Sequence, residues 1–456
     1  MTDVWEQVPL FSTQKIRRRS LLERALMTGV SLISVGTTLQ SCTTDTGLTG
    51  SSLNFANWAS AETATRSNID KALQAFETQN HVQVNNIGMP FDDVLNQLTA
   101  MTNAGIPPDV MELSGNWPHV LGGTGALADL SQFASQDWRK DAFRNSFEAG
   151  TYKGTLYAVP FSITPHGFWY NKKLMTNAGL DATKPPRTIG ELNQAMEMLR
   201  EALPADAYPL GIDISKTEYA LIGFWPWIWT FGGNPMVDDG KGNVAINWAD
   251  DGTVAAFQWL QDIVKKRWTP NGQAIKAERD LMAFEKLVFK LDGPYLTGIM
   301  GDSNPDVFGS VEKVNASFGV TTTPLGPGVS QPVTCADIHN LGMSQLAQNK
   351  ALAWKLIDFL TTSRDVILSF LIPEGGVLPH LSFNTDTQLY AKYYSDNISR
   401  SFITDIIRTM RPPAFGIHYS TATMAVVTAL QEIANGAQVK PRLRKLTDEV
   451  KAIYRS

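Results

Sequence analysis

Cysteine is scarce in this sequence, which has only Cys42 and Cys335 among its 456 residues. Two cysteines so far apart exclude the disulfide-rich frameworks that stabilise small secreted proteins. The hydrophobic content of 43% and the charged content of 18% are typical of a folded globular chain. We therefore expect the stability of this chain to rest on core packing.

Catalytic and metal-binding signatures are also lacking. The sequence has no Gly-x-Ser-x-Gly elbow, no phosphate-binding loop and no Cys-x-x-Cys or His-x-x-x-His pair. Its six histidines show no metal-like spacing, so we expect no metal and no cofactor. The formal net charge of −5 argues against a nucleic-acid partner, because phosphate binding needs a basic surface.

The first 41 residues have the pattern of an export signal. Arg18 and Arg19 precede an apolar run at 25–39, which is too short to span a bilayer comfortably. The arginine pair resembles a twin-arginine leader, and the sequence ending at Cys42 resembles a bacterial lipobox. We expect residues 1–41 to be a signal peptide, Cys42 to be lipidated and residues 42–52 to form a flexible tether. An ordinary secretory leader with an unmodified cysteine is the alternative.

The rest of the chain, about 415 residues, is longer than one domain normally is, so we expect two lobes. Strand-like and helix-like stretches alternate from residue 53 to residue 113, which predicts a parallel sheet covered on both faces. Thr188 and Glu191 have the spacing of a capping box at a helix start. Helices are expected at the end of the chain, at 351–361, 401–410, 421–434 and 444–454.

Several short motifs occur in a characteristic order over about residues 52–440. They include Gly154–Phe161, Trp169–Leu174, Pro185–Leu192, Phe231–Asn234, Asp292–Tyr295, Ala353–Leu360 and Gly375–Pro379. In this order and spacing they resemble the extracellular solute-binding proteins of sugar ABC transporters, the maltose-binding-type family.

The resemblance implies an α/β protein with the two-lobed periplasmic binding protein fold (type II-like) and a ligand cleft between the lobes. The N-lobe would comprise residues 52–162 plus 341–384, and the C-lobe residues 166–337 plus 395–456. Three crossings would join them, near 162–166, 337–341 and 383–394.

The resemblance also implies a function. The chain would be a monomeric, lipid-anchored binding protein, not an enzyme, on the periplasmic or extracellular face of the bacterial cytoplasmic membrane. It would capture a neutral di- or oligosaccharide by hinge closure and deliver it to a membrane permease with a separate ATPase. An α-glucoside such as maltose, trehalose, sucrose or glucosylglycerol is the expected ligand. The alternatives are a secreted glycoside hydrolase with a carboxylate pair, such as Glu62 and Glu112, and a sugar receptor for signalling.

Two segments that follow predicted strands each combine a carboxylate with a tryptophan. The first contains Trp58 and Glu62, and the second contains Glu112, Asn116 and Trp117. Ligands of open α/β sheets bind beyond the carboxyl ends of strands. Carboxylates and amides can bind sugar hydroxyls, and flat rings can cover the C–H faces of a sugar. We predict that these residues contact the ligand, with helix capping and loop packing as the alternative.

Further candidates come from the later motifs. The aromatic run at 223–230 has the period-2 spacing of a strand, but Gly232 and Gly233 after it resemble the family's helix end. In a helix Trp225 and Trp229 would share one face, and Trp225 is the first candidate for the cleft. Tyr295 stands where the family often has a stacking tryptophan. The other predicted ligand-binding residues are Thr164 in the first crossing, the close-approach pair Gly375 and Gly376, and Arg411 and Tyr419 near the end.

Overall fold

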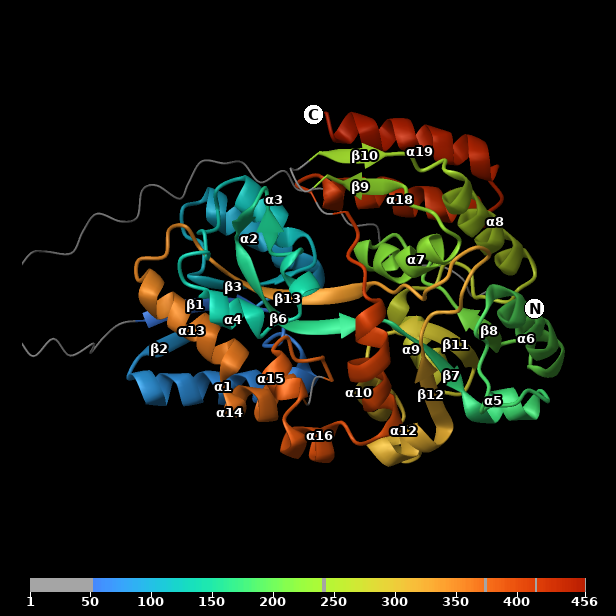
Figure 1. Cartoon of the computed structure of the whole chain (residues 1–456), viewed down its shortest axis with the longest axis horizontal. Coiled ribbons are helices and arrows are strands. Elements are labelled where there is room, and N and C mark those ends of the chain that lie inside the picture. The colour runs from blue at the N-terminus through green and yellow to red at the C-terminus, as the bar shows by residue number, and fades with distance from the viewer. Residues whose placement is uncertain (1–51, 240–242, 373–374, 415, 456) are drawn as a thin grey trace, which may run out of the picture. The chain divides into compact units, whose positions relative to one another are not determined.

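The computed structural model describes residues 52–239, 243–372, 375–414 and 416–455. The predicted leader, Cys42 and the tether up to residue 51 lie outside the described residues. Two sheets, each covered by helices, form the centres of two lobes (Figure 1). The lobe boundaries given above stay a prediction, and below we call the lobes the first and the second.

The first lobe is built on a five-stranded sheet with the order β2-β1-β3-β13-β6. Its strands are β1 (Ser52–Asn57), β2 (Gln83–Gly88), β3 (Val110–Ser114), β6 (Ala158–Pro165) and β13 (Ala336–Met343). As predicted, β1 runs parallel to β2 and to β3. Every residue of β3 is buried, which is typical of a strand covered on both faces.

The second lobe contains a four-stranded sheet with the order β12-β7-β11-β8. Its strands are β7 (Gly167–Asn171), β8 (Tyr208–Gly211), β11 (Leu287–Asp292) and β12 (Phe318–Thr321). Two small hairpins complete the strands, β4 (Thr151–Tyr152) with β5 (Thr155–Leu156) and β9 (Met236–Asp238) with β10 (Val244–Ile246).

Neither sheet is wholly parallel, which corrects the prediction of parallel-sheet lobes. Strand β13 is antiparallel to β3 and to β6, and β7 is antiparallel to β11 and to β12. The cause is the connection between the lobes, because the direction of β6 and β13 is set by the crossing and not by a β-α-β unit. The third predicted crossing, at 383–394, contains helical segments instead of a strand.

Helices cover both sheets. Those of the first lobe are α1 (Thr63–Asn80), η1 (Phe91–Asp93), α2 (Val94–Asn103), α3 (Trp117–Gly123), α4 (Gln136–Lys140), η2 (Arg144–Phe147), α13 (Lys350–Thr362), α14 (Arg364–Val366), η3 (Ile367–Leu371), α15 (Leu381–Asn384) and α16 (Thr387–Tyr393). Those of the second lobe are α5 (Lys172–Asn177), α6 (Ile189–Ala202), α7 (Glu218–Thr230), α8 (Asp251–Lys265), α9 (Ile275–Ala283), α10 (Leu296–Ser303), α11 (Pro305–Phe308), α12 (Val311–Ser317), α17 (Asn397–Ser401), η4 (Phe402–Ile406), η5 (Ile407–Thr409), α18 (Tyr419–Ala434) and α19 (Val439–Ile453).

Local sequence explains how several of these helices begin. The Thr188 side chain accepts a hydrogen bond from the Glu191 backbone N–H, and the Glu191 carboxylate binds the Thr188 N–H in return. This is the predicted capping box, which satisfies two backbone donors at the start of α6.

The long antiparallel strands β6 and β13 pair along their length and extend between the first lobe and the second (Figure 1). Separate apolar clusters lie on either side of this connection. One contains Phe55, Phe76 and Leu356 of the first lobe, and the largest contains Phe168, Trp227 and Leu430 of the second. Because each lobe has its own core, the strands between them can act as a hinge.

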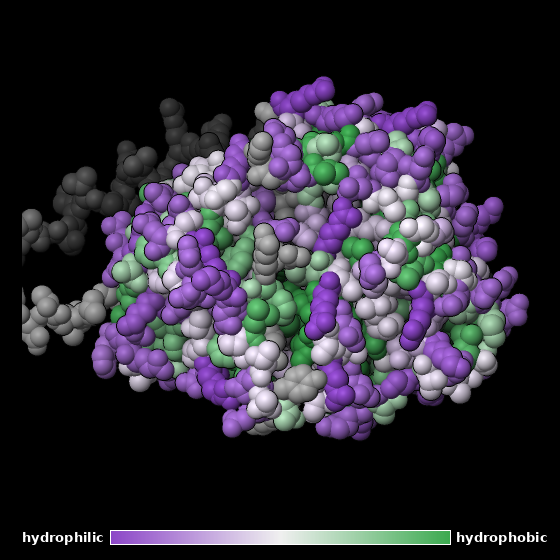
Figure 2. Space-filling model, in the orientation of Figure 1, coloured by the Kyte–Doolittle hydropathy of each residue, from purple (hydrophilic) through white to green (hydrophobic). Residues whose placement is uncertain are grey.

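Hydrophilic residues cover most of the face seen in Figure 2, and hydrophobic residues show there in small groups. Within the described part of the chain, no helix combines the length and the apolar character needed to cross a membrane.

Candidate functional site between the two lobes

Three of the predicted residues meet at the carboxyl ends of β1 and β3. The Trp58 ring contacts that of Trp117 edge to face, with centroids 6.1 Å apart, and Phe91 lies 5.4 Å from both rings. Glu112 lies in β3 itself and is 1% exposed. The parallel pairing of β1 with β3 brings these side chains together.

His339 completes this group, although the sequence analysis did not select it. It lies on β13, and its two ring nitrogens are each 3.4 Å from a carboxylate oxygen, of Glu112 on one side and of Asp337 on the other. Burial alone would lower the pKa of His339, but the two carboxylates raise it well above its usual range. Asp337 also accepts a hydrogen bond of 2.9 Å from the Ser114 hydroxyl.

Glu62 and Asn116 lie at the border of the first lobe. By surface area Glu62 is exposed, yet partial desolvation in the cleft raises its pKa, and the positive charges of His339 and Arg279 oppose that rise. Asn116 is buried, and its amide donates a hydrogen bond of 3.1 Å to the Ser420 hydroxyl of the second lobe.

The second lobe contributes a polar group that includes the predicted Tyr295. Arg279 of α9 donates two hydrogen bonds to Asp292, of 2.9 and 2.8 Å, and a third of 3.1 Å to the Tyr219 hydroxyl. Tyr219 and Tyr295 are hydrogen-bonded through their hydroxyls. Burial would raise the pKa of Asp292, but the Arg279 guanidinium lowers it to about 2.

The aromatic run of α7 is helical, as predicted, and belongs to the core. Trp225 and Trp229 stack with centroids 5.4 Å apart, whereas Trp227 packs against Trp259. Trp225 is 1% exposed, and its indole N–H donates a 2.7 Å hydrogen bond to the Tyr419 hydroxyl. Trp225 therefore supports Tyr419, which lines the space between the lobes.

Thr164 and the glycine pair lie close to protein atoms. The Thr164 hydroxyl donates a 2.7 Å hydrogen bond to the Asp337 carbonyl. A Cβ atom on Gly375 would lie 3.2 Å from the Tyr295 backbone, and one on Gly376 would lie 2.0 Å from the Ser162 hydroxyl oxygen. Gly375 also has φ +80°, a conformation that favours glycine. Gly375 therefore permits close packing against Tyr295, and Gly376 permits it against Ser162.

A cavity of about 40 Å³ lies between the two groups of side chains. Its walls include Asn116, Trp117, Asp337, Glu218 and Tyr419. Burial raises the pKa of Glu218 to about 7, and the nearby charge of Asp337 adds to the rise. None of the described residues that line this cavity is basic.

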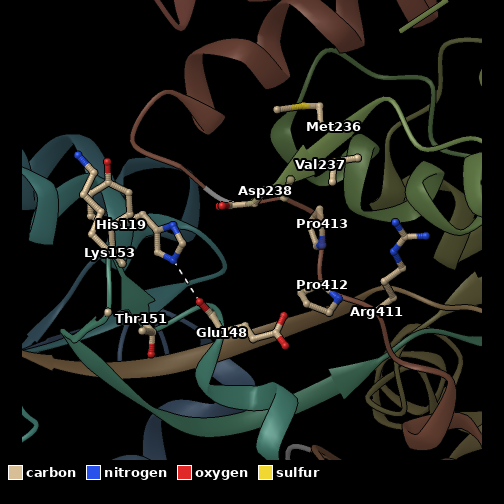
Figure 3. Close-up of a pocket in the computed structure, with 13 residues that line it drawn as sticks. His119, Glu148, Thr151, Lys153, Met236, Val237, Asp238, Arg411, Pro412 and Pro413 are labelled. Carbon is tan, nitrogen blue, oxygen red and sulfur yellow. Dashed lines mark hydrogen bonds between the residues drawn. The ribbon is translucent and has the colours of Figure 1, made fainter. Parts of the chain in front are cut away.

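Arg411 lies apart from this group, in an open pocket of about 420 Å³ (Figure 3). The figure shows its guanidinium turned away from the Glu148 carboxylate. The guanidinium donates a 2.6 Å hydrogen bond to the Asn234 side chain and lies over the Trp229 ring. Both pockets include Pro413. The smaller cavity contains more of the predicted residues and lies at the strand ends, so we take it as the candidate site.

The sequence did not reveal Glu218, Tyr219, Arg279, Asp337 and His339 as residues of this site. The sequence did contain a signal for His339. Asp337 and His339 are two residues apart on a predicted crossing strand, so their side chains lie on the same face of it. No local signal identifies Arg279, which joins the site through its pairing with Asp292. Among the described residues, no three His, Cys, Asp or Glu side chains are grouped as a metal site would require.

Comparison with known proteins gives the chain a family. Residues 71–381 match the sequence profile of the bacterial extracellular solute-binding proteins. A maltotriose-binding protein of Pyrococcus abyssi is 23% identical over 303 residues, which cover 64% of this chain and 58% of that protein.

Solved structures show the same fold. An ABC transporter solute-binding protein of Thermotoga lettingae with bound α-D-tagatose has a TM-score of 0.74 at 20% identity, and covers 88% of this chain and 99% of its own. Maltose-bound MalE3 of T. maritima has a TM-score of 0.73 at 21% identity, with the same coverage. The two-lobed fold predicted from the sequence is therefore confirmed.

These matched proteins are binding proteins and not enzymes, which confirms the prediction that this chain is not an enzyme. The chain belongs to the family of bacterial extracellular solute-binding proteins.

Proposed function

We propose that this chain is the sugar-binding component of an ABC importer and that its ligand binds between the two lobes. The observation that carries the proposal is that both lobes present aromatic rings and hydrogen-bonding groups to one small cavity. Membership of an extracellular family implies a periplasmic or extracellular location. The maltotriose-binding relative supports a sugar as the ligand class.

The chemistry of the cavity suits a sugar. A sugar ring has C–H faces, which flat rings cover, and hydroxyls around its edge, which carboxylates and hydroxyls bind. Trp117 of the first lobe and Tyr419 of the second line the cavity with rings. Trp58 contacts Trp117, and Tyr295 is hydrogen-bonded to Tyr219 of the lining. Glu62 and Glu112 are the carboxylates that we expect to bind hydroxyls.

The charges near the cavity favour a neutral ligand. Arg279 is paired with Asp292, and His339 lies between Glu112 and Asp337, so neither cation is left to neutralise an anionic sugar. We therefore propose a neutral di- or oligosaccharide, with an α-glucoside such as maltose, trehalose, sucrose or glucosylglycerol as the first class to test.

The size of the cavity favours hinge motion. Pockets for small ligands are roughly 300–1,000 Å³, whereas this cavity is about 40 Å³. The lobes must therefore part before a disaccharide enters, and they close when both contact it. Solution scattering of the chain before and after sugar addition tests this step. A radius of gyration that stays the same with and without a bound sugar argues against hinge motion.

A screen of neutral sugars tests the ligand class. A sugar at 100 times its dissociation constant should raise the free energy of unfolding by about 2.7 kcal/mol. Glu112→Gln should weaken binding about tenfold or more, because a hydrogen bond to a charged group is lost. Glu197→Gln, on the exposed side of α6, is the matched control and should bind like the wild type. If no sugar in the panel stabilises the chain, the sugar proposal fails.

We also propose that lipid on Cys42 keeps the binding protein near a membrane permease with a separate ATPase. In this proposal residues 1–41 are removed and residues 42–52 link the folded part to the membrane. Cys42→Ser should move the protein from the membrane fraction to the soluble fraction of a bacterial host without changing sugar affinity. Equal membrane retention of both forms argues against the anchor.

A further inference from the structure

The Tyr219 hydroxyl lies at the centre of a group of hydrogen bonds, and the chemistry of its partners determines which atom donates in each bond. Its oxygen lies 3.1 Å from Arg279 Nη2 and 3.3 Å from His166 Nε2, and it is hydrogen-bonded to the Tyr295 hydroxyl. A hydroxyl has one proton to donate and two lone pairs to accept with. Three partners therefore use all of its capacity, and each must take a defined role.

Arg279 fixes the first role. A guanidinium can only donate, so Arg279 occupies one lone pair of Tyr219. The guanidinium cannot turn away easily, because Nε and Nη2 both bind Asp292, which is 0% exposed. Its central carbon also lies 4.9 Å from the Tyr295 ring centroid. The Arg279 guanidinium is thus fixed in contact with both Tyr219 and Tyr295.

His166 fixes the second role. The side chain is buried, and within the described part of the chain its Nδ1 has no hydrogen-bond partner. A buried N–H without a partner is rare, whereas an unused lone pair is tolerated more often. The imidazole is neutral, because burial lowers its pKa to about 4. The proton therefore belongs on Nε2, and His166 donates to the second lone pair of Tyr219.

The direction of the bond between the tyrosines follows. With both lone pairs occupied, Tyr219 must donate its own proton to the Tyr295 oxygen. The Tyr295 proton is then not used within this group, and the Tyr295 side chain is partly exposed next to Tyr219, which lines the cavity. A donor at the end of a chain that begins at a guanidinium is strengthened by the hydrogen bonds behind it.

We propose that Tyr295 is a specificity-determining hydrogen-bond donor to an oxygen of the ligand, and that Arg279 and His166 are positioning residues that direct its proton outward through Tyr219. This inference rests on the proposed function for the identity of the ligand. It adds a requirement that the ligand must meet: the sugar must have an oxygen that accepts a hydrogen bond from the Tyr295 hydroxyl. The aromatic ring of Tyr295 alone makes no such demand.

The first experiment needs no sugar. Nitrogen NMR of the purified chain with ¹⁵N-labelled histidine distinguishes the two neutral forms of each imidazole, and His166→Gln identifies the His166 signals. We expect His166 to be neutral at pH 7 with its proton on Nε2. A proton on Nδ1 overturns the inference, whether or not any sugar binds.

The second experiment measures affinity for maltose, or for the sugar in the panel that stabilises the chain most. Tyr295→Phe should raise the dissociation constant about tenfold. Tyr170→Phe, which removes a half-buried hydroxyl from β7, is the matched control and should leave it unchanged. Unchanged affinity in Tyr295→Phe overturns the inference.

A double-mutant cycle tests the positioning role. If Arg279 directs the Tyr295 proton, Tyr295→Phe should cost much less than tenfold when introduced into Arg279→Gln. If Tyr295→Phe raises the dissociation constant by the same factor in the wild type and in Arg279→Gln, Arg279 does not position the Tyr295 proton. Failure of every sugar to bind rejects the proposed function, and the histidine measurement then still decides the proton directions.

Discussion

Lys290→Met is expected to lower the free energy of unfolding by up to about 3 to 5 kcal/mol at alkaline pH, because it removes the ammonium that stabilises the buried charge of Glu278. Lys290 lies in the centre of the second sheet, where β11 pairs with β7 and β8. Its ammonium is hydrogen-bonded to Glu278, and the two residues are 1% and 0% exposed. Gly211 leaves the space for Glu278, since a Cβ there would lie 3.1 Å from the carboxylate.

The pH dependence of this loss has a definite sign. Burial raises the pKa of Glu278 to about 7, and Lys290 limits that rise. Without Lys290 the carboxyl group holds its proton more tightly, so at pH 5 it is uncharged and the variant loses little. As the pH rises above 7, Glu278 of the wild type ionises beside Lys290, whereas the carboxyl group of the variant must keep its proton, so the loss grows. Urea unfolding at pH 5, 7 and 8 measures the trend.

A second substitution separates two contributions to stability. One is the free energy lost when a buried carboxylate has no partner, and the other is the net contribution of the intact ion pair. In Lys290→Met with Glu278→Leu, stability should return to the wild-type value or exceed it, because apolar residues can replace a buried ion pair. Lys286→Met breaks the exposed bridge to Asp206 and serves as the matched control, with a much smaller change expected. A double variant as unstable as the single one contradicts this explanation.

Asp292→Asn should lower the free energy of unfolding by about 2 to 3 kcal/mol at neutral pH, as the pKa shift of Asp292 implies. The substitution keeps the shape of the side chain but removes the charge that binds Arg279, and it places an amide donor against a guanidinium donor. Because Arg279 also binds Tyr219, the same variant should weaken sugar binding.

The contribution of Asp292 to the free energy of unfolding should be lost at acidic pH. Its pKa in the folded chain is about 2, below the ordinary value of 3.8. Its contribution is therefore fully present above pH 4 and is lost as the pH falls toward 2, so the wild type and Asp292→Asn should converge there. Asp386→Asn, at an exposed bridge to Arg364, should change stability much less. A difference that persists at pH 2 refutes the ion-pair explanation.

The comparison of sequence and structure separates local from non-local information. The predicted capping box at Thr188 and Glu191 forms, and the helix that contains Trp225 and Trp229 forms with the predicted shared face. Both depend on residues three or four positions apart, so the sequence displays them directly. The parallel direction of β1, β2 and β3 follows from the alternation of strands and helices, which the sequence also displays.

The site was predicted in part. Trp58, Glu112 and Trp117 meet, because strands that pair in parallel bring their carboxyl ends to one edge. Arg411 lies in a different pocket, and the Gly375 and Gly376 pair packs on protein atoms. Trp225 is buried behind Tyr419. Whether these residues bind ligand is for the affinity measurements to decide.

The sequence by itself determined the class of this protein: a cysteine-poor, mildly acidic, two-lobed α/β chain with the motifs of an extracellular solute-binding protein. Only the tertiary structure decided which polar side chains meet. His339 reaches Glu112 because β13 pairs with β3, although more than two hundred residues separate them. Arg279 reaches Tyr219 and Tyr295 through Asp292. Such contacts depend on strand pairing and on the approach of the two lobes, and no short stretch of sequence contains that information.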